Sequence, residues 1–271
     1  MQALRCVDLL ETRVHIAAMN FDISHLLAQW DYQPGQVVVR KFMGNDGVEK
    51  IQLRVDMGLL QMNATGRPDG KRPLGHPSLF DYYQAQLYKH LAAHDGNDED
   101  FVLQAEDCAK LQLEALQYHH RYICLLQLED YDGVIRDTER NLAVFAFVNA
   151  HAESEELAWS LQQFQTQLLM IHTRARATQS LRADDYPTAV KQIEEGVEGI
   201  REFYREHSRL ELLEQSGEIH SLENWLVEIH AKRPLSEREK IEKALHEAVQ
   251  HEDYEKAAQM RDALRNFKIA E

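Results

Sequence analysis

The segment LSEREKIEKALHEAVQHEDYEKAAQMRDALRNF, residues 235–267, decides the fold of this 271-residue chain. Its first half carries an apolar stripe at helical spacing, formed by Ile241, Leu245 and Val249. Its second half carries a facing stripe, formed by Tyr254, Ala257, Ala258, Arg261 and Leu264. Alanines at the closest approach permit tight packing of two helices. The segment therefore predicts an antiparallel helical hairpin, with Ser236 as the N-cap that follows Pro234.

Twelve residues of this hairpin match the pattern of a known family: Ile241, Leu245, Ala248, Glu252, Asp253, Tyr254, Ala257, Ala258, Arg261, Asp262, Leu264 and Phe267. With these residues the segment resembles the UVR motif of excinuclease subunits B and C. The motif also occurs in some Clp-type ATPases and in the activator of a protein-arginine kinase. Tyr254 stands where that family often has Phe. The family's hairpins connect proteins to one another, and the resemblance implies the same role here.

A two-helix hairpin of this length cannot bury both of its faces, so we expect its remaining apolar edge to dock elsewhere. The predicted partner-binding residues are Tyr254, Ala257, Ala258, Arg261 and Leu264. The partner is another protein or a second copy of the chain. The alternative is that the hairpin is only the last helix pair of a longer array, with a polar outer face.

The joint of the hairpin recurs twice upstream. LEDYDGV at 128–134 and ADDYPTAV at 183–190 share its order of acid, Asp, Tyr and then a small or β-branched residue, as in HEDYEKAA at 251–258. In each copy Asp can cap the next helix, and acids favour the positive end of its dipole. The phrase predicts three helix–helix joints.

The body of the chain reads as helical from residue 99 onward. The expected helices span 99–128, 131–150, 154–183, 186–205, 209–231, 236–250 and 253–267. A further helix, SLFDYYQAQLYKHLAAH, begins at the capping pair Ser78 and Asp81. The first two joints resemble those of tetratricopeptide repeats, although the preceding helices are too long for a standard repeat. A tetratricopeptide-like array and a general helical bundle both remain open.

The N-terminal third differs in composition, since most of the Gly and Pro residues lie before residue 80. Residues 36–62 alternate apolar and polar side chains around a turn at 44–47, which predicts a β-hairpin with a third strand at 59–62. We therefore expect a mainly α fold with three parts. These are a small α+β module at 1–77, a helical body at 78–232 and the UVR-like hairpin at 235–268.

The loop at 66–77 is rich in Gly and Pro and carries four basic side chains: Arg67, Lys71, Arg72 and His76. Glycines there could bring backbone N–H groups close to an anion between these cations. No phosphate-binding fingerprint accompanies them. The loop is thus either a purely structural connection or an anion or ligand site.

The charge of the chain is uneven. Its formal net charge is −15, and residues 91–271 hold 20 Lys and Arg against 36 Asp and Glu. Such a surface repels phosphate backbones, so we expect no direct contact with nucleic acid. No apolar run approaches membrane-spanning length, and residues 1–19 do not form a signal peptide. We expect no membrane partner and a cytoplasmic location.

The sequence offers no catalytic motif, and we predict no catalytic residue, cofactor or metal site. His90 and His94, and likewise His120 and Cys124, have helical i,i+4 spacing without a third ligand. The three cysteines are expected to be reduced and buried.

The leading hypothesis is therefore a non-enzymatic adaptor or regulator that docks through helical hairpins. One alternative is an accessory factor of DNA repair that acts through a repair protein. The other is an enzyme or ligand sensor that uses the loop at 66–77.

Overall fold

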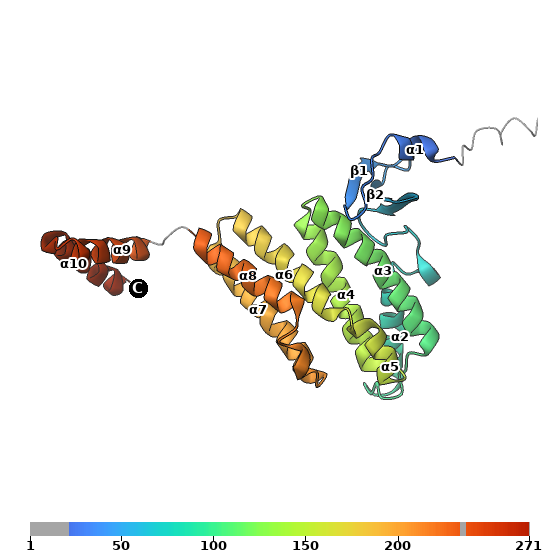
Figure 1. Cartoon of the computed structure of the whole chain (residues 1–271). Coiled ribbons are helices and arrows are strands. Elements are labelled where there is room, and N and C mark those ends of the chain that lie inside the picture. Colours follow the sequence, from blue (N-terminus) through green and yellow to red (C-terminus); the bar gives the residue numbers. More distant parts are fainter. Residues whose placement is uncertain (1–21, 234–236, 271) are drawn as a thin grey trace, which may run out of the picture. The chain divides into compact units, whose positions relative to one another are not determined.

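The computed structural model describes residues 22–233 and 237–270 (Figure 1). It is mainly α-helical, with one small antiparallel sheet near the N-terminus and a helical hairpin near the C-terminus, so the predicted fold class is confirmed. The chain divides into two compact units, one up to Thr178 and one from Gln179. The predictions for the N-terminal 19 residues, for Cys6 and for the N-cap Ser236 lie outside the described residues.

The sheet follows the predicted hairpin and third strand. Its strands are β1 (Val38–Met43), β2 (Glu49–Val55) and β3 (Gly58–Asn63), paired antiparallel in that order. The turn between β1 and β2 closes where Gly44 donates its N–H to the Val48 carbonyl at 2.8 Å, and Gly47 adopts a φ of 73° there. Only glycine takes that angle at little cost, which is why the turn forms at this point.

The first unit contains a short helix before the sheet, α1 (Ser24–Ala28), and a 3-10 turn, η2 (Pro73–Gly75). Its longer helices are α2 (Leu79–Ala93), α3 (Ala105–Gln127), α4 (Tyr131–His151), α5 (Glu155–Gln162) and α6 (Gln165–Arg182), of which the last crosses into the second unit. Ser78 caps α2 by accepting the N–H of Asp81, as predicted.

The sheet and the helices of the first unit share one core. Ile51 and Met62 of the sheet belong to the same buried cluster as Leu111 of α3 and Val144 of α4. Figure 1 shows β1 and β2 beside α3, which they contact. The structure thus groups the sheet with the helices that follow it, whereas the sequence placed a boundary at Pro77.

The second unit contains α7 (Tyr186–Glu206), the turn η3 (Leu210–Leu212), α8 (Gly217–Lys232), α9 (Glu237–Gln250) and α10 (Tyr254–Ala270). Helices α7 and α8 pack on each other, as do α9 and α10. The apolar face of α7 is fully buried at its centre, where Ile193 and Ile200 lie.

All three predicted joints have the same backbone geometry. The residue before the capping Asp adopts a left-handed φ of 58°, 57° or 54° at Glu129, Asp184 and Glu252, respectively. The Asp N–H then bonds to a carbonyl five residues earlier, at 2.9, 3.0 and 2.8 Å, on Leu125, Ser180 and Ala248. The Asp carboxylate accepts the N–H three residues on, from Gly133, Thr188 and Lys256. The repeated phrase therefore encodes one helix end and one helix start together.

Two predicted helix starts are wrong for a common reason. The helix expected over 99–128 starts later, because Gln104 and Asp107 form a capping box with reciprocal side-chain bonds. The helix expected over 209–231 is preceded by η3, and Ser216 caps α8. In both places a local cap overrides the helical periodicity of the residues before it.

The single helix predicted over 154–183 is also wrong, because α5 and α6 are separate. The Phe164 N–H bonds to the Leu161 carbonyl three residues back, at 3.1 Å. The Ser160 carbonyl, four residues back, instead accepts side-chain amides from Gln112 at 3.3 Å and Gln163 at 3.0 Å. These side chains replace a backbone bond of the helix and break it.

Asp130 provides a test of the joint. Replacing it with Ala removes the cap of α4, and we expect the free energy of unfolding to fall by about 1 kcal/mol. Asp130→Asn is the matched control, because Asn also caps helices but removes the charge that faces Lys41 at 3.4 Å. Urea unfolding followed by circular dichroism measures both. Equal losses in the two variants would contradict the capping role.

Candidate functional site

The UVR-like hairpin is built on small residues. Helices α9 and α10 pack along each other, and Ala248 and Ala257 are the buried side chains of this contact. Without bulk at these positions the two backbones approach closely. Val249, which the sequence placed in the apolar stripe of the first helix, instead lies on the outside and is 54% exposed. Val249 points outward because Ala248 lies at the contact between the two helices beside the turn. The next residue along the helix therefore faces away from α10.

The predicted partner-binding residues divide into two groups. Ala257 faces α9 and is not available to a partner. Ala258 and Leu264 are half-buried, and Arg261 is exposed. Tyr254 is 73% exposed, although tyrosine carries a large apolar ring. Four of the five residues therefore reach the surface of the hairpin.

Comparison of the joints shows what is unusual about Tyr254. Tyr131 occupies the same place in the first joint, yet it is half-buried and packs against the core of its unit. Eight residues after the capping Asp, Thr138 of α4 is fully buried, whereas Arg261 of α10 is exposed. The Thr138 hydroxyl lies 3.0 Å from His172 Nδ1 on α6. A third helix therefore lies against the face of α4 that corresponds to the exposed face of α10.

The comparisons with known proteins agree with this geometry. Residues 236–269 match the family model described as the UvrB/uvrC motif. The hairpin is a UVR motif. UVR motifs occur in DNA repair proteins and mediate protein–protein interaction. No curated protein and no solved structure matches the chain significantly.

The loop at 66–77 uses its first basic side chain internally. Arg67 Nε donates to Glu114 of α3 at 2.8 Å, and its Nη1 donates to both carboxylate oxygens of Asp69 at 2.7 and 2.8 Å. Lys71 and Arg72 are exposed, and His76 packs edge-on against Tyr82. Two of the four predicted anion-binding residues, Lys71 and Arg72, thus have exposed side chains, and Arg72 Nη2 donates to the Gly75 carbonyl at 3.4 Å.

Glu114 is the centre of this arrangement and is fully buried. Besides Arg67, its carboxylate accepts the backbone N–H groups of Leu79 at 2.8 Å and Phe80 at 3.2 Å, at the start of α2. It also accepts a bond from Arg140 of α4, whose guanidinium lies 4.0 Å from the ring centre of Tyr118. One carboxylate therefore joins the loop, α2, α3 and α4.

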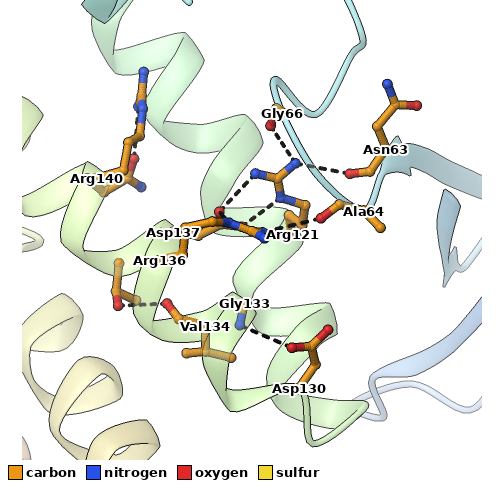
Figure 2. A network of polar contacts seen from close by, with 12 residues as sticks. Asn63, Ala64, Gly66, Arg121, Asp130, Gly133, Val134, Arg136, Asp137 and Arg140 are labelled. Carbon is orange, nitrogen blue, oxygen red and sulfur yellow. Dashed lines mark hydrogen bonds and ion pairs between the residues drawn. The ribbon is translucent and has the colours of Figure 1, made fainter. Parts of the chain in front are cut away.

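Arg121 holds the preceding segment in the same way. Figure 2 shows its guanidinium between Asp137 of α4 and the backbone of the chain after β3. It donates to both oxygens of Asp137 at 2.6 and 2.8 Å, and to the carbonyls of Asn63 at 3.0 Å and Gly66 at 2.7 Å. Arg136 adds a bond to Asp137 and one to Ala64. Both members of the Arg121–Asp137 pair are fully buried.

The sequence interpretation missed this network, because its charge argument placed the acidic side chains at the surface. That assignment is wrong for Glu114 and Asp137. A signal was present, since Glu114 and Arg121 lie among the apolar positions of α3 that include Leu111 and Tyr118. Charged residues on a buried stripe require partners.

The described residues contain no group of three His, Cys, Asp or Glu side chains that could hold a metal ion. The His90 and His94 rings stack at 3.9 Å. Cys108 and Cys124 are free and buried, as predicted, and burial raises the pKa of the Cys124 thiol to about 12. None of the helices in 22–233 and 237–270 has the length and apolar character of a membrane span.

The buried ion pair provides the second prediction. Arg121→Met removes the charge partner of Asp137 and two carbonyl contacts, so we expect a loss of about 3–5 kcal/mol in the free energy of unfolding. Arg136→Met is the matched control, because Arg136 also binds Asp137 but lies at the surface. We expect this variant to lose less than about 1 kcal/mol in the free energy of unfolding. Urea unfolding measures both variants, and similar losses would show that burial of Arg121 contributes little.

The third prediction concerns pH. Burial lowers the pKa values of His119, His120, His151 and His172 below their usual 6.5. The unfolded chain then binds more protons below pH 6.5, so stability is fully present above that pH and declines as the pH falls further. We expect the urea midpoint to decrease from pH 7 to pH 5. His172→Gln should flatten this decrease, whereas His230→Gln at an exposed residue should leave it unchanged.

Proposed function

We propose that this protein is a non-enzymatic adaptor whose UVR hairpin docks on a helix of a partner protein. The observation that carries the proposal is the contrast between Tyr131 and Tyr254, which occupy the same joint position but differ in exposure. In the first unit a third helix lies against this face. On α10 a partner would supply the corresponding helix.

The chemistry of the exposed face supports a protein partner. Exposed tyrosines and arginines are the side chains that most often dominate the affinity of protein interfaces. Tyr254 and Arg261 lie seven residues apart, which places them on one side of α10. Arg261 stands in α10 where α4 has Thr138, whose hydroxyl contacts the third helix. We therefore propose that the partner helix presents an acidic side chain to Arg261.

A role in DNA repair is the second candidate, and it rests on the UVR motif, which occurs in DNA repair proteins. The net charge of −15 disfavours direct contact with DNA. Such a role would therefore run through a repair protein bound to the hairpin. A ligand-sensing role of the loop at 66–77 would depend on Lys71 and Arg72, since Arg67 is paired internally.

The test compares four forms of the chain in affinity capture from nuclease-treated lysate. We expect a protein retained by the full chain to be lost when the chain ends at Ala231. Tyr254→Ala and Arg261→Glu should each weaken its binding at least tenfold, because they remove the aromatic anchor and reverse the charge. Binding of the purified partner is then measured by titration calorimetry.

Lys256→Ala is the matched control, because Lys256 is exposed on the same helix about 200° around its axis from Tyr254. It should bind the partner normally. If the chain that ends at Ala231 captures the same proteins, the hairpin is only the last pair of the helical array. Sedimentation of the purified chain shows whether the retained partner is a second copy.

A further inference from the structure

A pocket of about 560 Å³ opens in the first unit among α3, α4, α5 and α6. Its size lies in the range of small-molecule sites. The residues that characterise it are Leu113, Leu116, His119, Phe145, Phe164 and Leu168. Neither the hairpin nor the loop at 66–77 contributes to it.

The floor of the pocket lies in the core, whereas its rim lies at the surface. Of its lining residues, Ala115, Phe145 and Leu168 are buried. At the rim, Leu113, Leu116 and Phe164 are 65%, 47% and 49% exposed. The space therefore leads from an apolar mouth inward between helices. A pocket with a buried floor suits a small molecule better than a helix, which needs a long surface groove.

The pocket has no charged lining. Its walls, all within the described residues, contain no Asp, Glu, Lys or Arg, although the chain is rich in all of them. A charged ligand would lose its hydration here without gaining a partner of opposite charge. The walls thus favour an uncharged, largely apolar molecule.

The lining includes the polar side chains of Gln112, Asn141 and Gln167 besides His119. Gln112 and Asn141 donate their amides to the carbonyls of Ser160 and Ala115. Tyr122 orients the ring of His119. His119 Nδ1 lies 2.7 Å from the Tyr122 hydroxyl. Burial raises the pKa of Tyr122, so the phenol keeps its proton and can donate it to Nδ1. Burial also lowers the pKa of His119, which keeps the imidazole neutral. In the tautomer that accepts the phenol proton at Nδ1, the imidazole proton lies on Nε2, which makes His119 a hydrogen-bond donor.

We propose that this pocket binds an uncharged, mainly apolar small molecule that carries one hydrogen-bond acceptor, such as a carbonyl, and that His119 Nε2–H donates to this acceptor. Apolar contact with the rim and floor supplies most of the affinity. The hydrogen bond selects among apolar molecules and orients the one that binds. None of the residues that line the pocket belongs to the hairpin.

Two fluorescent probes test the proposal on the full chain. Nile red is uncharged and has a carbonyl, whereas diphenylhexatriene is a hydrocarbon without an acceptor. We expect both to bind saturably with one site per chain. His119→Phe keeps an aromatic ring but removes the donor, so it should weaken Nile red about fivefold and leave diphenylhexatriene unchanged.

Leu116→Trp narrows the mouth at an exposed position where the fold tolerates a larger side chain, and it should weaken both probes at least tenfold. Tyr254→Ala should affect neither, which separates this site from the hairpin. Unsaturable fluorescence, or binding that survives Leu116→Trp, would overturn the proposal. A third outcome would also overturn it: neither probe binds the unaltered chain, and Leu116→Trp no longer captures a protein that the unaltered chain captures. The pocket would then be part of a surface that binds a protein.

Discussion

The first unit depends on one constraint: the charges buried on α3 must be paired. Glu114 and Arg121 lie two turns apart on the same helix, and an unpaired charge at either place would cost several kcal/mol. Their partners come from the end of β3 and the chain after it, from the start of α2 and from α4. The sheet and α2 can therefore take only positions in which these bonds form. Burial of apolar side chains drives the folding of this unit. The need to pair the buried charges restricts which arrangements of its elements can form.

Much of the fold could be predicted because its signals are local. Gly47 and the alternation around it determine the β-hairpin, and each joint phrase determines the end of one helix and the start of the next. The helix boundaries that were predicted wrongly also depend on local interactions. The cap at Gln104 and the side-chain bonds to Ser160 compete with helical periodicity, and periodicity alone does not show which of them prevails.

The polar network could not be predicted in the same way. Arg67 and Glu114 are 47 residues apart, and a basic loop residue has the same sequence signature whether it binds an anion or a buried carboxylate. The choice depends on tertiary distance, which periodicity does not contain. The same limit applies to the pocket, because its walls come from four helices whose apolar residues look like ordinary core positions.

The joints show that the same local sequence pattern can have different roles in two places of the chain. Tyr131 and Tyr254 follow the same pattern, and the backbone around them has the same hydrogen bonds. Their exposure differs because exposure is set by a third element that the pattern does not include. Where the chain supplies that element, the joint contributes to the core. Where the chain leaves the tyrosine exposed, the same joint presents an aromatic ring and a guanidinium on one face of α10. The role of that face then depends on the helix that a partner can place against it.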